Sequence, residues 1–230
     1  MLNKTQKTLC ALAVITATMG SAMAANSVDV RVIGTITPAA CTPTVSGGGV
    51  VDYGVIRANT LSADAYTVLP TKQLDFSIVC DAPIKAGWTV TNDRPGTVAG
   101  ATELSTGYAV SPVALSLPTK LVAGLGLAGT APIGGYTMAL SNVMTDGSAA
   151  TTVTTDNSIV NWEPSTDGMM FGGIDGTKIA PAATGTIVPV AFTNFAAKLN
   201  VQAYINKSSA LDLSKQIQLD GQNTIEIVYL

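Results

Sequence analysis

The side chains of this sequence that could do chemistry are thiols and carboxylates, and the thiols are the more informative. Of three cysteines, Cys10 lies in an N-terminal segment that we expect to be removed on export, which leaves Cys41 and Cys80. Two thiols in an oxidising compartment pair by default, and a disulfide that closes a loop of about forty residues contributes ~4 kcal/mol in the chain-entropy model. We therefore predict a Cys41–Cys80 disulfide, with a free thiol or a metal site as the alternatives.

The carboxylates offer little for catalysis because the chain has no histidine. Hydrolases with a histidine base are therefore excluded, as are the common zinc sites that use histidine. Asp156, Asp167 and Asp175 could act as an acid and a base, but they lie in Thr-Asp or Asp-Gly contexts where aspartate is expected for backbone reasons. We expect no catalytic residue, no metal and no enzyme activity.

A glycine-rich stretch, residues 124–129, matches the G-x-G-x-x-G pattern of dinucleotide sites. Such a site needs a helix that opens at the third glycine, whereas Pro132, Gly134 and Gly135 follow almost at once. We therefore expect no nucleotide and no other cofactor.

Residues 1–24 have the composition of an export signal. Residues 1–7 include two lysines, Lys4 and Lys7, and no acidic residue, and the apolar stretch 9–17 that follows is too short to cross a bilayer. Ala22 and Ala24 then form an A-x-A cleavage site. Loss of this segment reduces the twelve basic residues to ten against fifteen acidic ones, a net charge of −5. A net negative charge argues against binding to nucleic acid, which is itself negatively charged.

Strands are the elements expected to position the two cysteines. The chain has 22 glycines and a charged fraction of only 12%, which suits short strands and tight turns. Apolar residues alternate over residues 74–80 and 199–205, which points Cys80 into the same core as Phe76. We expect short strands and long loops over residues 94–186, and one all-β domain over residues 38–230.

Both ends of the exported chain alternate strongly. The residues that share one face near the start are Val28, Val30, Val32, Gly34 and Ile36, and those near the end are Ile225, Ile227 and Tyr229, ahead of Leu230. The first segment precedes the disulfide loop, so it is either an ordinary first strand or a strand that leaves its domain. Gly34 favours the second interpretation, because a strand inserted into another subunit's groove needs a small residue where the groove is shallow.

These features resemble the chaperone-usher fimbrial subunits, the pilins. The alternating extension, Gly34 seven positions before Cys41, the spacing to Cys80 and the penultimate Tyr229 carry the resemblance. The segments 40–43 and 47–54 look more narrowly like longer fimbrial-like proteins of unassigned function. The resemblance is strong at both ends of the chain and weak through its centre.

The resemblance implies an incomplete immunoglobulin-like β-sandwich whose missing last strand leaves a groove beside the C-terminal strand. In that family a periplasmic chaperone fills the groove first, pairing with the strand that here carries Ile225, Ile227, Tyr229 and Leu230. At the outer-membrane usher, the extension of a neighbouring fimbrial subunit, here residues 25–37, replaces it. The function implied is a structural subunit at the bacterial cell surface that supports adhesion to a host or other receptor.

Two other classes of protein remain as alternatives. An outer-membrane β-barrel would share the export signal and the alternation, but this chain has only two tryptophans and six tyrosines for the aromatic girdles. A secreted carbohydrate-binding β-sandwich would need an exposed ring such as Trp88 or Trp162, and both lie in apolar, strand-like stretches that favour packing.

Overall fold

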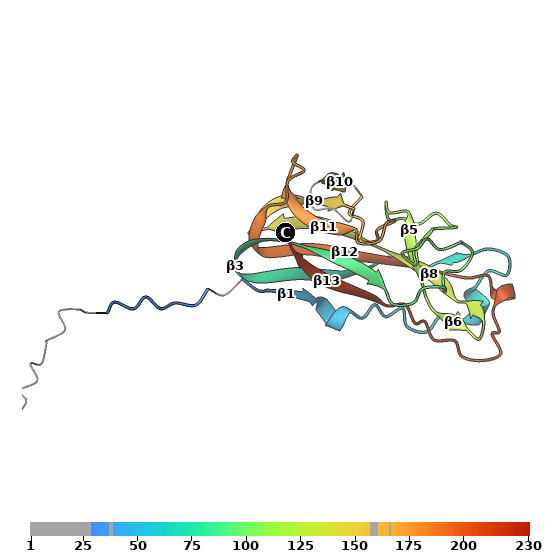
Figure 1. Cartoon of the computed structure of the whole chain (residues 1–230). Coiled ribbons are helices and arrows are strands. Elements are labelled where there is room, and N and C mark those ends of the chain that lie inside the picture. The colour runs from blue at the N-terminus through green and yellow to red at the C-terminus, as the bar shows by residue number, and fades with distance from the viewer. Residues whose placement is uncertain (1–28, 37–38, 157–160, 166) are drawn as a thin grey trace, which may run out of the picture. The chain divides into compact units, whose positions relative to one another are not determined.

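The computed structural model describes residues 29–36, 39–156, 161–165 and 167–230, and its described part is almost entirely strands and loops (Figure 1). The chain divides into two units, residues 1–37 and residues 38–230. Within the described ranges, no helix is long and apolar enough to span a membrane. The all-β class predicted from composition is therefore confirmed. The predicted export signal lies outside the described residues.

The described residues of the second unit form thirteen strands and three short 3-10 helices. In chain order they are β1 (Cys41–Val45), η1 (Ser46–Gly49), η2 (Ala58–Thr60), β2 (Thr67–Val68), β3 (Lys72–Asn92), β4 (Ala109–Val110), β5 (Leu121–Gly124), β6 (Leu127–Ala128), β7 (Ala131–Pro132), β8 (Gly134–Thr145), β9 (Ser148–Thr155), β10 (Glu163–Ser165), β11 (Lys178–Ala183), β12 (Ala191–Ile205), η3 (Ser208–Ala210) and β13 (Asn223–Tyr229).

β3 is the strand around which the others are arranged. Its first part pairs with β1 and β12, and its last part pairs with β11 and β13. Figure 1 shows β3 curling over between these parts. The pairings also run from β12 through β8 and β9 to β11 and so return to β3, which gives the sheet a barrel-like closure.

The core lies inside this closure and is built around four aromatic rings. Phe76 and Trp88, from the two parts of β3, meet edge to face with their ring centroids 5.5 Å apart. Phe195 of β12 contacts both rings, and Phe192 contacts Phe195. All four side chains are almost completely buried. The predicted inward faces of residues 74–80 and 199–205 are confirmed, since Phe76, Ile78 and Cys80 are buried, as are Leu199, Val201, Ala203 and Ile205.

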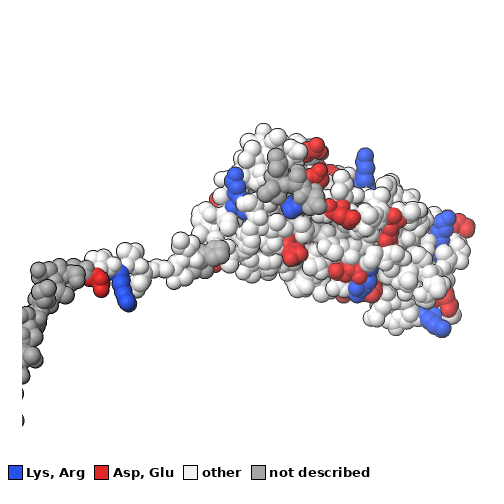
Figure 2. All heavy atoms as spheres, viewed as in Figure 1, with Lys and Arg blue, Asp and Glu red and all other residues white. Residues whose placement is uncertain are grey.

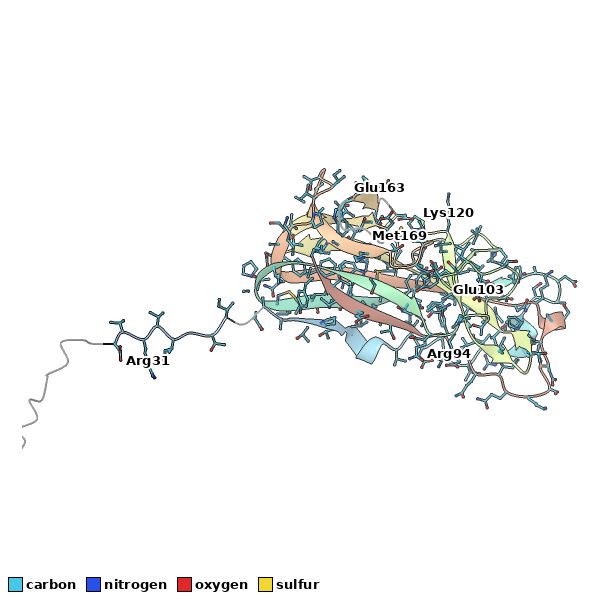
Figure 3. All side chains as sticks on the ribbon, viewed as in Figure 1. Arg31, Arg94, Glu103, Lys120, Glu163 and Met169 are labelled. Carbon is cyan, nitrogen blue, oxygen red and sulfur yellow. A yellow bond between two sulfur atoms is a disulfide. The ribbon has the colours of Figure 1, made fainter. Side chains whose placement is uncertain are left out.

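The prediction of short strands through the centre is only partly right. β4 to β7 are short, but β8 has twelve residues and β9 has eight. The first part of β8 is buried on both faces because the central loops cover its outer side. The hydroxyl groups of Thr119 and Thr137 lie 2.6 Å apart, and Ala139 bridges to Met169. Figure 3 labels Met169, in the segment between β10 and β11. A strand buried on both faces shows no polar alternation.

The predicted disulfide is present. Cys41 opens β1 directly opposite Cys80 on β3, and their sulfur atoms are bonded at 2.06 Å. The bond joins the first strand of the domain to the strand at its centre.

Candidate functional site

The candidate site is an apolar groove between β1 and β13. β1 pairs with the first part of β3 and β13 with its last part, in antiparallel registers. Among the described residues neither strand has a backbone partner on its other side, so both are edge strands. Edge strands present unpaired N–H and C=O groups that can bond to another strand.

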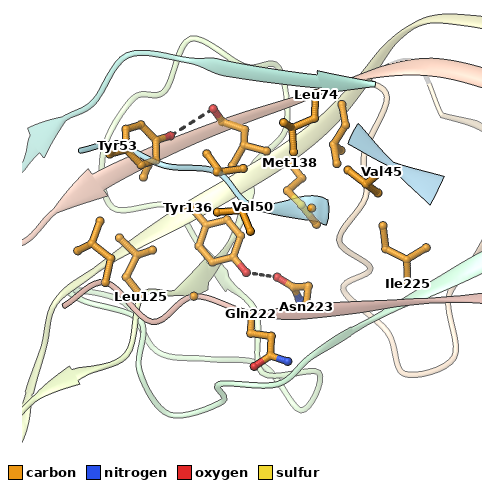
Figure 4. Close-up of a pocket in the computed structure, with 17 residues that line it drawn as sticks. Val45, Val50, Tyr53, Leu74, Leu125, Tyr136, Met138, Gln222, Asn223 and Ile225 are labelled. Atoms are coloured by element: carbon orange, nitrogen blue, oxygen red, sulfur yellow. Dashed lines mark hydrogen bonds between the residues drawn. The ribbon is translucent and has the colours of Figure 1, made fainter. Parts of the chain in front are cut away.

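A cavity of about 390 Å³ opens between these two edges (Figure 4). Val45 of β1 and Ile225 of β13 line it from opposite edges, and Met138, Leu199 and Val201 are on its floor. The floor strands, β8 and β12, therefore supply apolar surface that β1 and β13 leave uncovered.

A second cavity, of about 740 Å³, continues the first beyond the ends of the two strands. Val50, Val51, Tyr53 and Leu219 line both cavities, so the two form one groove. Its walls past the strands are residues 50–61 on one side and residues 211–219 on the other.

Residues 45–53 and residues 213–227 keep the period-two pattern of a strand, although only part of each wall is hydrogen-bonded as one, and Ile56 falls outside this pattern. The side chains that pack partly buried against the core are Val45, Val51, Tyr53 and Ile56 on one wall and Leu213, Ile217, Leu219, Ile225 and Ile227 on the other. A strand placed between the walls would complete the burial of these side chains. The free energy available is roughly 25 cal/mol for each Å² of apolar surface removed from water.

Polar side chains also line the groove, among them Gln216, Gln218 and Gln222, and two tyrosines contribute their hydroxyl groups. The hydroxyl of Tyr53 donates to the carbonyl of Val201 at 3.3 Å, and burial raises the pKa of this phenol to about 12. The hydroxyl of Tyr136 donates to Oδ1 of Asn223 (Figure 4), and burial raises the pKa of Tyr136 as well. Both phenols therefore stay neutral at physiological pH.

Charged side chains are scattered over the face drawn in Figure 2 and form no dense patch of one sign. The charged residues that line the groove, Asp52 and Lys215, belong to its second cavity. Within the described residues, no group of three or more acidic or cysteine side chains could hold a metal ion. The lining of the first cavity therefore contains no charged side chain.

The residues predicted for the last strand do lie at this site. Ile225 and Ile227 of β13 are partly buried against the core. Tyr229 is 50% exposed, and its hydroxyl accepts a hydrogen bond from the backbone N–H of Cys41. The N–H of Leu230 donates to the carbonyl of Lys85 at 3.1 Å.

The residues predicted as a donor strand form no strand within residues 29–36. Their apolar side chains are exposed, with Val32 at 95% and Ile36 at 100%. Gly34 is also exposed, and a Cβ atom placed on it would meet no atom within 4 Å. Val28 lies outside the described residues.

The other motifs weighed from the sequence have local structural roles. Gly126 and Gly129 have positive φ angles of 83° and 65° and flank β6, which pairs with β7 where a nucleotide site would need a helix. Asp167 accepts a hydrogen bond from the N–H of Met169 at 3.1 Å, as a turn aspartate does. Trp88 is 0% exposed and cannot stack on a sugar, and Trp162 packs partly buried beside Val153.

Much of the groove was not anticipated from the sequence. The wall formed by residues 211–219 precedes β13 and belongs to no strand, yet its apolar residues continue the alternation of Ile225 and Ile227. That alternation is the signal that could have identified it. Gly221 has a further role, because a Cβ atom there would lie 2.6 Å from Cε1 of Tyr136 on the groove floor.

The chain is similar to one family model and to two proteins of Escherichia coli. Residues 30–136 match the family model described as "Protein of unknown function (DUF1120)". Protein GltF of Escherichia coli (strain K12) is 30% identical, over 99% of this chain and 98% of that protein. The uncharacterized protein YhcF of the same organism is 38% identical over 74 residues, 32% of this chain and 31% of that protein. No solved structure matches the chain.

Proposed function

Starting from the finding that this chain belongs to the same family as protein GltF of Escherichia coli, we propose that it is a structural subunit of a chaperone-usher fimbria. The subunit assembles by donor-strand complementation and exchange. Its groove accepts a strand from a partner, and its own N-terminal extension is the strand that it lends.

The observation that carries this proposal is the open groove between β1 and β13. A domain with two facing edge strands and an apolar floor is one strand short of complete burial. Main-chain hydrogen bonds along an added strand provide affinity, and side chains at alternate positions fill the groove and set the register. This missing strand is also the basis for the finer fold assignment we propose, an incomplete immunoglobulin-like sandwich.

The extension has the chemistry that such a groove requires. Val30, Val32 and Ile36 occupy alternate positions and are exposed, so an apolar face is available for pairing with another molecule. Asp29 and Arg31 carry the charges of the opposite face. Because the extension of one subunit and the groove of another never saturate each other in a ring, the assembly grows as a fibre.

The partners follow from this mode of assembly. Residues 1–24 direct export, and a periplasmic chaperone covers the groove by pairing with β13. The outer-membrane usher then exchanges the chaperone's strand for the extension of the neighbouring subunit. The product is a fimbria at the bacterial cell surface that supports adhesion to a host or other receptor.

The experiment that tests this function follows a deletion of residues 28–36 in cells that produce the fimbria. We expect the shortened subunit to be exported and to co-purify with the chaperone, because its groove is intact, but to be missing from sheared fibres. A matched control exchanges Asp29 and Arg31 for serine, which leaves the apolar face in place and should preserve incorporation. Normal incorporation of the deleted subunit would refute the donor role of the extension.

A further inference from the structure

The groove edge β13 needs something to fix its register. It pairs with β3 on one side only, so a slip by one residue would cost few backbone bonds. Such a slip would turn Ile225 and Ile227 away from the groove, because side chains alternate between the faces of a strand. A device that prevents the slip must act where β13 begins or ends.

The start of β13 carries a polar cluster of this kind. Asn223, its first residue, accepts a hydrogen bond from the hydroxyl of Tyr136. The side-chain amide of Asn223 donates to the hydroxyl of Tyr108 and to the carbonyl of Thr91, both at 3.0 Å. These partners come from β8, from the loop before β4 and from β3, so one amide joins three separate segments to the edge strand.

Both tyrosines are held in turn by the central region of the chain. The ring of Tyr108 stacks on Phe171, with centroids 4.4 Å apart and planes 13° apart. Tyr136 meets the same ring edge on, at 6.0 Å. The hydroxyl of Tyr108 also donates to the carbonyl of Val90 at 3.0 Å. Tyr108 and Phe171 are each only 2% exposed, so the surrounding side chains hold both rings in place.

We propose that Asn223, Tyr136 and Tyr108 fix the register of β13 and so keep its apolar face toward the groove. The central region, residues 94–186, therefore supports the groove edge, because it supplies Tyr108 and Phe171. The sequence alone did not predict this role. The three polar residues are positioning residues. The role of this fixed register in assembly rests on the proposed function, because β13 is the strand with which a donor strand would pair.

A register fixed by these bonds has a measurable consequence in the backbone of β13. Removal of one partner leaves a partly buried polar group unsatisfied and makes local opening of the strand easier. Amide hydrogen exchange of the full exported chain, followed by mass spectrometry, reports that opening segment by segment. The variants are Asn223→Ala, Tyr136→Phe and Tyr108→Phe, of which the last two keep the ring and its packing.

The matched control is Tyr204→Phe. Its hydroxyl donates to the carbonyl of Ala99 at 2.7 Å within a separate cluster, so the change also removes one buried tyrosine hydrogen bond. We expect exchange in β13 to accelerate about five-fold in Tyr136→Phe, the order expected for one lost hydrogen bond. The acceleration should be larger in Tyr108→Phe, which loses two hydrogen bonds, and in Asn223→Ala, which loses three. Exchange in β12 should stay unchanged in those variants, and Tyr204→Phe should leave β13 unchanged.

Unchanged exchange in β13 in both tyrosine test variants would overturn the proposal, and so would an equal acceleration in Tyr204→Phe. This result does not depend on donor binding. If a peptide of residues 28–36 fails to bind the wild-type chain while the exchange pattern is as expected, the proposed function is wrong and the register device stands. If the peptide binds and β13 exchanges normally in the variants, only the register device is wrong.

Discussion

The backbone N–H of Cys41 donates a hydrogen bond of 2.9 Å to the hydroxyl of Tyr229, which joins the two edges of the groove at one end. Cys41 is in turn bonded to Cys80 on β3. The first and last strands of the domain are therefore tied to each other and to its central strand at the same place. Away from this end, the groove lies open between β1 and β13.

Replacing Tyr229 by phenylalanine should loosen this tie and leave the ring in place. The hydrogen bond is partly exposed to water, so we expect the free energy of unfolding to fall by about 0.5–1 kcal/mol. Urea unfolding measures this change, and amide exchange at Cys41 should accelerate in the same variant. Wild-type values for both quantities would mean that the bond contributes nothing to the groove.

Removing the disulfide should have a larger effect. The bond closes a sequence separation of 39 residues. In the chain-entropy model a loop of this length contributes ~4 kcal/mol through the unfolded state. The double variant Cys41→Ala and Cys80→Ala should lose most of that amount in urea unfolding, and the wild-type chain under reducing conditions is the matched comparison. A loss below about 1 kcal/mol would contradict the model for this loop.

A methyl group on Gly221 should distort the groove. Its Cβ atom would lie 2.6 Å from Cε1 of Tyr136 and 3.0 Å from Cδ2 of Leu125, so the ring or the backbone must move. Overpacking of this kind costs about 1–3 kcal/mol. The control is Gly173→Ala, where the nearest atoms are at an ordinary 3.8 Å. Thermal unfolding should show a clear loss for Gly221→Ala, and equal stabilities for the two variants would contradict the close approach.

Acid should weaken the contact between the β8–β9 turn and β12. Hydrogen bonds from the N–H groups of Asn194 and Thr193 lower the pKa of Asp146 below its usual value of 3.8. A carboxyl whose folded pKa is lowered stabilises the fold above the unfolded pKa, and this contribution is lost as the pH falls through the folded pKa.

The variant Asp146→Asn tests this sign because it keeps a side-chain oxygen and removes the charge. We expect the variant to be less stable than the wild type in urea at neutral pH, and the difference to shrink toward zero at about pH 2. A difference that stays constant or grows on acidification would show that the charge is not the cause.

The sequence was most informative where one face of a strand is buried and the other is wet. Residues 74–80 are of this kind, and their alternation predicted the buried Phe76 and the disulfide partner Cys80. The length of β8 was not predicted because Thr137 and Ala139, on its outer face, are covered by loops that are distant in sequence. Its pattern depends on tertiary contacts that no local rule contains.

The candidate site was predicted only in part for a related reason. Ile225 and Ile227 were identified because they end the chain in a regular strand. The polar cluster of Asn223, Tyr136 and Tyr108 brings together residues separated by as many as 115 positions. An asparagine and two tyrosines at such spacings carry no local signal, so their association became evident only from the folded structure.

The most direct test of the central claim is a calorimetric titration of the chain that lacks residues 25–37 with a peptide of residues 28–36. We expect one peptide to bind per chain, with a negative heat-capacity change because apolar surface is buried in the groove. A peptide with Val30→Asp and Val32→Asp is the matched control and should not bind. Failure of the native peptide to bind, or equal binding of the aspartate peptide, would contradict the assignment of the groove as an acceptor for this strand.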